Sequence, residues 1–174
     1  PYRNTYCEYL PSGEQKFAKL KEELKKARYY IFLEYFIIEE GVMWNSILEI
    51  LVDKVKEGVD VRVIYDDFGC VTKLPYKYCK TLESYGIKCC VFNPFIPVLS
   101  LRLNNRDHRK IVVIDGKTAY TGGINLADEY INAVEKFGHW RDNMLEIKGD
   151  AVWSLTVMFL SMWNYLRKTD EDYN

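Results

Sequence analysis

The stretch from His108 to Thr121 restricts the fold more than any other part of the sequence, because it combines two strands with a tight turn. The run His108–Ile114 is largely apolar and β-branched, which is typical of a buried strand. Asp115-Gly116 is a pair typical of hairpin turns, so Lys117–Thr121 should return as an antiparallel partner.

Side-chain alternation decides which polar groups of this hairpin can act together. Side chains two residues apart on a strand share a face, so His108 and Lys110 should point one way and Arg109 the other. Gly122-Gly123 allows a close backbone approach, and Asn125 stands where a short helix should begin. A neutral base, a fixed cation, an amide and backbone donors would then converge, which indicates a phosphoryl site.

These residue types suit displacement at a phosphodiester. Covalent catalysis splits that reaction into two steps, and imidazole is a suitable nucleophile because it is largely uncharged at neutral pH. We expect His108 Nε2 to attack phosphorus and form a phosphohistidine. Lys110 would hold a non-bridging oxygen and stabilise the transition state. Asn125 would donate its amide to the same group, or serve only as a helix N-cap.

The same residues resemble the HKD motif of the phospholipase D superfamily: His-x-Lys, an Asp five residues after the Lys, and then Gly-Gly-x-Asn. Further stretches are similar to bacterial cardiolipin synthase: NRDHRKI at 105–111, DEY at 128–130, WRD at 140–142 and LEYFII at 33–38. The resemblance extends over nearly the whole chain.

Fold and reaction follow from this resemblance as expectations. Residues 1–174 should form one phospholipase D-like domain, an α/β/α sandwich around a mixed sheet, and the alternation of apolar strands and amphipathic helices favours the same class. The expected activity is phosphatidyl transfer between two phosphatidylglycerol molecules, giving cardiolipin and glycerol without a metal or another cofactor. The parent enzyme should lie at the cell membrane with this domain on its cytoplasmic side, whereas the chain alone should be soluble.

The resemblance also implies a missing partner. Protonation of the leaving group needs a general acid, and one imidazole cannot be nucleophile and acid in the same step. The superfamily supplies a second HKD motif, here expected from the other half of the parent chain or from a homodimer copy. We therefore expect this chain, the first half, to be inactive when isolated.

Three more parts of the motif receive roles by resemblance. An acidic residue after the Gly-Gly-x-Asn segment should orient the histidine ring, and Asp142, at the expected start of the next strand, is favoured over Glu146. Asp115 falls in the turn, so its expected role is structural, as are those of Gly122 and Gly123.

Several segments keep two interpretations. Residues 93–105 are either a buried crossover or a lipid-facing lip of the cleft, in which Phe95 and Arg102, with Arg106 beside them, would contact substrate. Glu34 either faces water at a strand end or lies buried near the site. Asp66-Asp67 either ends a strand or, less favoured, binds a metal.

Charge and composition limit the alternatives. The net charge is −1 and the pI about 6.2, which disfavours a nucleic-acid partner. The chain has two His and five Cys without metal-ligand spacing, so we expect no metal site and reduced thiols. A dimeric phosphodiesterase or nuclease of the superfamily, or a non-catalytic scaffold domain, remain as alternative functions.

Overall fold

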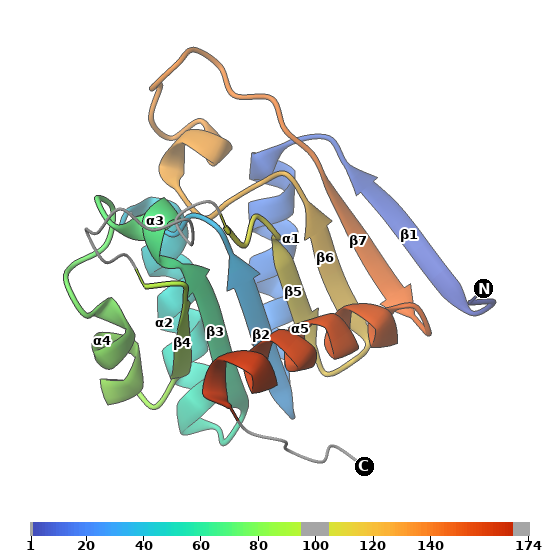
Figure 1. Cartoon of the computed structure of the whole chain (residues 1–174). Coiled ribbons are helices and arrows are strands. Elements are labelled where there is room, and N and C mark those ends of the chain that lie inside the picture. The colour runs from blue at the N-terminus through green and yellow to red at the C-terminus, as the bar shows by residue number, and fades with distance from the viewer. Residues whose placement is uncertain (1, 95–104, 169–174) are drawn as a thin grey trace.

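The computed structural model describes residues 2–94 and 105–168, in which seven strands form one mixed sheet. The strands are β1 (Thr5–Leu10), β2 (Tyr30–Tyr35), β3 (Asp60–Asp66), β4 (Lys88–Phe92), β5 (Ile111–Ile114), β6 (Thr118–Gly122) and β7 (Met144–Gly149). Their order is β1-β7-β6-β5-β2-β3-β4 (Figure 1). Strands β2, β3 and β4 are parallel, and all other neighbours are antiparallel.

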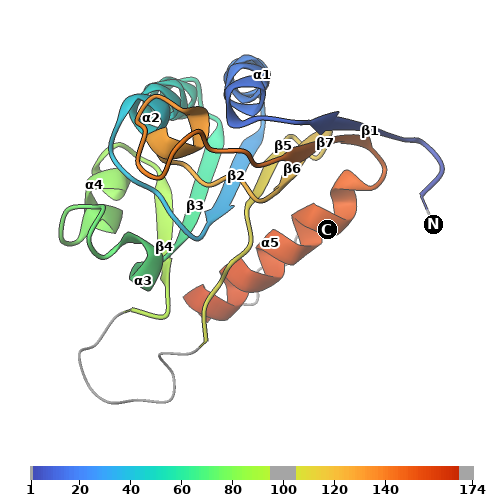
Figure 2. The same ribbon diagram turned by 90° about the horizontal axis from the view of Figure 1, so that it is seen from above.

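Helices cover both faces of this sheet (Figure 2). Helices α1 (Gly13–Lys26), α2 (Val42–Lys56) and α4 (Tyr78–Ser84) contribute to one hydrophobic core, whereas α5 (Val152–Arg167) closes a second core on the opposite face. The short α3 (Asp67–Cys70) and a 3-10 helix (Asp128–Ile131) lie beyond the carboxyl ends of the parallel strands. The expected α/β/α sandwich around a mixed sheet is therefore confirmed.

Burial on both faces explains the central strand β2. Ile31 and Leu33 belong to the core under α1 and α2, whereas the Phe32 ring stacks on Phe159 of α5 with centroids 4.6 Å apart. Each such side chain contributes roughly 1.5–3 kcal/mol through removal of apolar surface from water. A nearly continuous apolar run is what a strand covered on both faces requires.

Strand boundaries differ from the sequence-based expectation around the HKD segment. The strand expected from His108 begins at Ile111, and the strand expected from Asp142 begins at Met144. Residues 107 and 109 are held instead by side-chain carboxylates: the Asp107 N–H donates to Asp66, and the Arg109 N–H donates to Asp107. The chain before β5 is thus fixed by side chains rather than by the strand ladder.

Within residues 2–94 and 105–168, every helix is too short or too polar to cross a bilayer.

Candidate active site

The segment before β5 lies at the carboxyl end of the parallel strands, because Ile111 pairs with Glu34 near the end of β2. His108 is exposed, whereas Lys110 is 3% exposed. Lys110 Nζ lies 2.7 Å from the His108 carbonyl oxygen and 3.1 Å from His108 Nδ1. The structure therefore brings the expected base and cation into direct contact.

This contact defines the state of the histidine ring. A Lys ammonium only donates, so in a hydrogen bond with Lys110 the His108 Nδ1 is the acceptor, and the ring hydrogen that accompanies this bond lies on Nε2. A nucleophilic Nε2 requires the other tautomer, with Nδ1–H bound to an acceptor. The expected role of His108 as a nucleophile would therefore require its Lys110 contact to be exchanged for an acceptor.

Phe36 supports both side chains. Its ring lies 4.7 Å from the His108 ring at an interplanar angle of 49°, and Lys110 Nζ lies 5.4 Å from its centroid. Sequence reasoning missed this contact, because Phe36 belongs to an apolar run in which nothing separates core from site.

Burial tunes the Lys110 cation. It lowers the pKa of Lys110 from an ordinary 10.5 to about 8, although the nearby Asp107 and Asp142 carboxylates oppose that shift. The group therefore remains charged at neutral pH while being poorly hydrated. Such an ammonium favours a phosphoryl oxygen that replaces its lost water.

Asn125 is buried and holds two parts of the chain together. Its Oδ1 accepts the Ile37 N–H at 3.0 Å, and its Nδ2 donates to the Tyr130 hydroxyl at 2.7 Å. It is not a helix N-cap, since the 3-10 helix begins at Asp128 with Ala127 before it. An NH2 group has two hydrogens, and the Tyr130 hydroxyl accepts one of them.

Asp142 reaches the site because residue 123 is glycine. A Cβ on Gly123 would overlap the Asp142 carboxylate, and a Cβ on Gly122 would press against Asn143 and Met144. Asp142 Oδ1 accepts the Asn143 N–H at 2.7 Å, and its charge acts on Lys110. The two glycines thus let residues 142–144, at the start of β7, pack closely against the end of β6. This packing places Asp142 at the same end of the sheet as His108.

Glu146, the other candidate for orienting the ring, is engaged elsewhere. It is buried on the face under α1, where it accepts the Tyr120 hydroxyl at 2.5 Å and pairs with Lys148 at 3.4 Å and Lys19 at 3.9 Å.

Asp115 lies at the far end of β5. Its carboxylate accepts three backbone N–H groups at the start of β2, from Arg28 and Tyr29 at 2.8 Å and from Tyr30 at 2.9 Å. Its φ of +51° is the left-handed conformation that Asp tolerates in turns. These contacts join the hairpin turn to the central strand.

Asp66 connects β3 to the HKD segment. Its carboxylate accepts the N–H groups of Gly69 at 3.2 Å and Asp107 at 3.0 Å, and Arg106 lies 3.7 Å away while stacking over Phe68.

Within the described residues, no group of three or more His, Cys, Asp or Glu is placed to hold a metal. Phe95, Arg102 and most of the proposed lipid-facing lip lie outside the described residues.

Glu34 is the polar residue whose position the sequence left most open. It is 0% exposed, so the water-facing alternative is wrong. Arg109, on the face opposite Lys110, reaches Glu34 Oε1 at 2.6 Å and Asp107 Oδ1 at 3.0 Å. The sequence signal for these contacts was a single charged residue, Glu34, inside an otherwise apolar strand.

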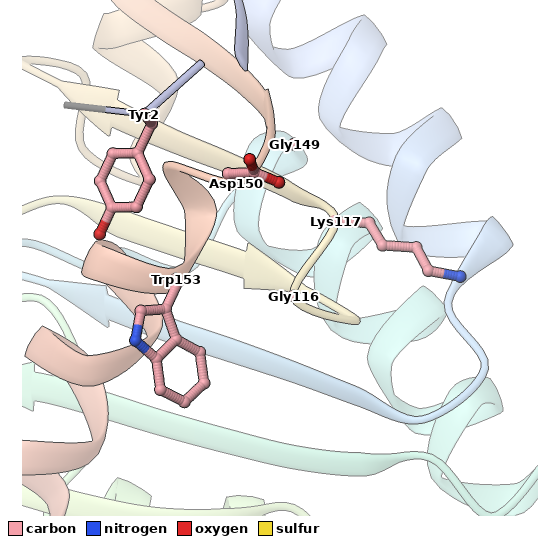
Figure 3. A pocket seen from close by; sticks show the side chains of 6 residues that line it. All are labelled: Tyr2, Gly116, Lys117, Gly149, Asp150 and Trp153. Atoms are coloured by element: carbon pink, nitrogen blue, oxygen red, sulfur yellow. The ribbon is translucent and has the colours of Figure 1, made fainter. Parts of the chain in front are cut away.

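A hollow of about 610 Å³ lies at the other end of the sheet. It is lined by residues of the β5–β6 turn and the start of α5, with Trp153 and Tyr2 at its wall (Figure 3). Its position beside Gly116 and Lys117 separates it from His108 by the length of β5. It therefore takes no part in the site described above.

Comparisons with known proteins identify the family of the chain. A family model described as "Cardiolipin synthase, PLD-like domain" matches residues 20–163. The chain is 53% identical to an uncharacterised Streptococcus mutans protein and 37% identical to a cardiolipin synthase of Oceanobacillus iheyensis, each over 99% of this chain. It spans 37% and 36% of the length of those two relatives.

Solved structures share the fold at low identity. A phospholipase D family member, Nuc from Salmonella typhimurium, matches with a TM-score of 0.67 at 18% identity, over 98% of this chain and 99% of its own. Phosphatidylserine synthase from Haemophilus influenzae matches with a TM-score of 0.71 at 18% identity, over 92% of this chain and 36% of its own.

Proposed function

The chain belongs to the family of phospholipase D-like domains of cardiolipin synthases, and from this premise we propose that it is one catalytic half of a phosphatidyltransferase. Its substrate is phosphatidylglycerol in a membrane, and its products are cardiolipin and glycerol. The observation that carries the proposal is the buried Lys110 ammonium against His108, since that pair combines a nucleophile with a phosphoryl-binding cation.

In the first step His108 Nε2 attacks phosphorus, and the bond from phosphorus to the glycerol headgroup breaks. The leaving oxygen takes a proton from the histidine of a second HKD motif, in the other half of the parent chain or in a second copy. A hydroxyl of a second phosphatidylglycerol then attacks the phosphohistidine, gives its proton back to that histidine and releases His108. Two phosphatidylglycerol molecules thus become one cardiolipin and one glycerol.

Each remaining residue has a role in this sequence. Lys110 and the second Nδ2 hydrogen of Asn125 hold the non-bridging oxygens, where charge accumulates in the transition state. Once His108 has left Lys110, the Asp142 carboxylate accepts a hydrogen bond from the His108 Nδ1–H. This bond keeps the ring hydrogen on Nδ1 and leaves Nε2 free to attack. None of these steps needs a metal, so a chelator should leave the rate unchanged.

The test uses the full-length parent with radiolabelled phosphatidylglycerol vesicles and, separately, single- and double-stranded nucleic acids. Cardiolipin and glycerol as the only labelled products, with nucleic acid untouched, is the expected result. Cleavage of nucleic acid without lipid transfer would assign the site to a dimeric phosphodiesterase. No turnover of either class would make the domain a scaffold.

A further inference from the structure

Three buried carboxyl groups and two guanidinium groups form a compact cluster directly behind His108. We call it the Glu34 cluster, and its members are Glu34, Asp66, Arg106, Asp107 and Arg109. Glu34 and Asp66 are 0% exposed, and Asp107 is 5% exposed. The Lys110 ammonium also acts on Asp107 and on Asp142. With these two included, four charged carboxylates would face three cations and leave one negative charge uncompensated, which is costly in a poorly hydrated interior.

Hydrogen bonding shows where the imbalance lies. Arg109 Nε donates to Asp107 Oδ1 at 3.0 Å, and Arg109 Nη2 lies 2.6 Å from Glu34 Oε1. One guanidinium thus brings two carboxyl groups together. Even so, both Glu34 oxygens and Asp107 Oδ2 are buried without a properly oriented donor. Both carboxyl groups contact the same Arg109 guanidinium, and a Glu34–Asp107 hydrogen bond contributes to the raised pKa of Glu34. Two carboxyl oxygens can form that bond only if one of them carries a hydrogen.

We propose that Glu34 is a positioning residue of the His108 site, which remains a neutral carboxylic acid and donates its proton to Asp107 Oδ2. The five residues of the cluster then hold two cations and two anions, and one Glu34 oxygen and Asp107 Oδ2 share a hydrogen bond. Burial, followed by the neighbouring Asp107 charge, raises the pKa of Glu34 to about 9, with Arg109 opposing. The charged groups one contact further away are Asp66, Arg106 and Lys110.

The consequence concerns the peptide on both sides of His108. Asp107 is held through its N–H by Asp66 and through its carboxylate by Arg109, and the same carboxylate accepts the Arg109 N–H. A protonated Glu34 would donate a hydrogen bond to Asp107 Oδ2, the carboxylate oxygen that otherwise has no donor. The backbone on both sides of His108 is then fixed next to the start of β5, and this backbone carries the exposed His108 side chain. This inference rests on the proposed function only where it concerns catalysis.

The first arm of the test measures unfolding of the 174-residue chain by urea between pH 5 and 8.5, for wild type and Glu34→Gln. A raised folded-state pKa means that between about pH 4.5 and 9 the folded protein binds more protons than the unfolded chain. Wild-type stability should therefore fall as pH rises, by up to about tenfold per pH unit in the unfolding equilibrium constant. Glu34→Gln lacks this contribution, so its stability relative to wild type should increase steadily with pH.

Glu49 provides a matched control, because it is exposed on α2 and Glu49→Gln makes the same chemical change. Its difference from wild type should be small and nearly independent of pH. A Glu34→Gln difference that is equally flat would show that Glu34 is ionised in the folded state, and would overturn the proposal.

The second arm measures kcat and KM of the full-length parent on phosphatidylglycerol vesicles at pH 7. Glu34→Gln, which can still donate to Asp107, should retain kcat within about threefold, whereas Glu34→Ala should lower kcat more than tenfold with KM within twofold. Equal losses in both variants, or a loss confined to KM, would refute a positioning role. If the wild-type parent transfers no lipid, the proposed function fails, and the first arm alone decides whether Glu34 is protonated.

Discussion

At one end of β5 the Asp115 carboxylate accepts three backbone N–H groups, whereas at the other end Glu34 and Asp107 retain oxygens without donors and Lys110 retains a poorly hydrated charge. The same four-residue strand therefore connects a carboxylate that has all its hydrogen-bond partners with polar atoms that lack some of theirs. A polar group with all its hydrogen bonds formed stabilises one arrangement of the chain and makes it rigid. Incomplete satisfaction leaves polar atoms that gain most when a ligand or a proton arrives. The comparison predicts that changes at the Asp115 end affect stability and changes at the His108 end affect rate.

The largest effect is expected at His108. His108→Ala in the full-length parent should lower kcat by more than ~10³-fold, because the covalent step is lost, while the unfolding midpoint changes little since the side chain is exposed. Single-turnover assays and thermal unfolding of the same preparations would measure both quantities. A variant that retains near wild-type turnover would remove the nucleophile from this end of β5.

A smaller loss of rate is expected at Asp142. Asp142→Asn should reduce kcat by roughly 10–10²-fold with an unchanged unfolding midpoint, because the imidazole loses the anion that orients it. Glu146→Gln is the matched control. It should lower stability through Tyr120 and the Lys148 pair, yet leave the rate per folded molecule intact. A reversed pattern would transfer the orienting role to Glu146.

The next effect appears only at alkaline pH. The pKa of Lys110 is lowered to about 8, so kcat/KM should fall about tenfold per pH unit above that value as the ammonium is lost. The contribution of Lys110 to the free energy of unfolding should instead rise with pH between about 8 and 10.5, because the unfolded chain binds more protons at this residue than the folded protein does. Lys110→Arg should remove the alkaline fall. Measurement in a Glu34→Gln background keeps Glu34 from contributing to the profile.

The smallest effect on activity is expected at Asp115. Asp115→Ala should lower the free energy of unfolding by about 2–3 kcal/mol, since three backbone donors lose a charged acceptor and the left-handed turn loses a tolerant residue. Activity per folded molecule should be unchanged. Asp115→Asn, which suits the same φ, should lose less stability. A folded Asp115→Ala protein without activity would contradict the distinction between the two ends.

Local sequence signals predicted the parts of the fold that depend on neighbours in the chain. The β-branched run before Asp115-Gly116 predicted the hairpin that the structure contains. The α/β/α layering followed from the alternation of such elements. The catalytic roles of His108, Lys110, Asn125 and Asp142 stay predictions.

Contacts between distant segments could not be predicted. Two hydrogen bonds, from the Ile37 N–H to Asn125 and from the Asp107 N–H to Asp66, join residues whose separation in sequence carries no periodic signal. The position of Glu34 could not be predicted either, because its partner Arg109 comes from a distant segment of the sequence. Strand β1 was not predicted at all, since its hydrogen-bonding partner β7 lies near the other end of the described chain.

That pairing of β1 with β7 determines when the sheet can be completed during folding. Thr5 pairs with Gly149 and Leu10 with Met144, so the entry of β1 must close a loop that contains all the other strands. Closing a long loop costs entropy before any contact rewards it, and native contacts of high sequence separation slow folding. On a ribosome, residues 5–10 would leave the exit tunnel long before β7 exists to receive them. We therefore expect the hairpin of β5 and β6 to form early from local contacts, and the pairing of β1 with β7 to form late and to limit the folding rate.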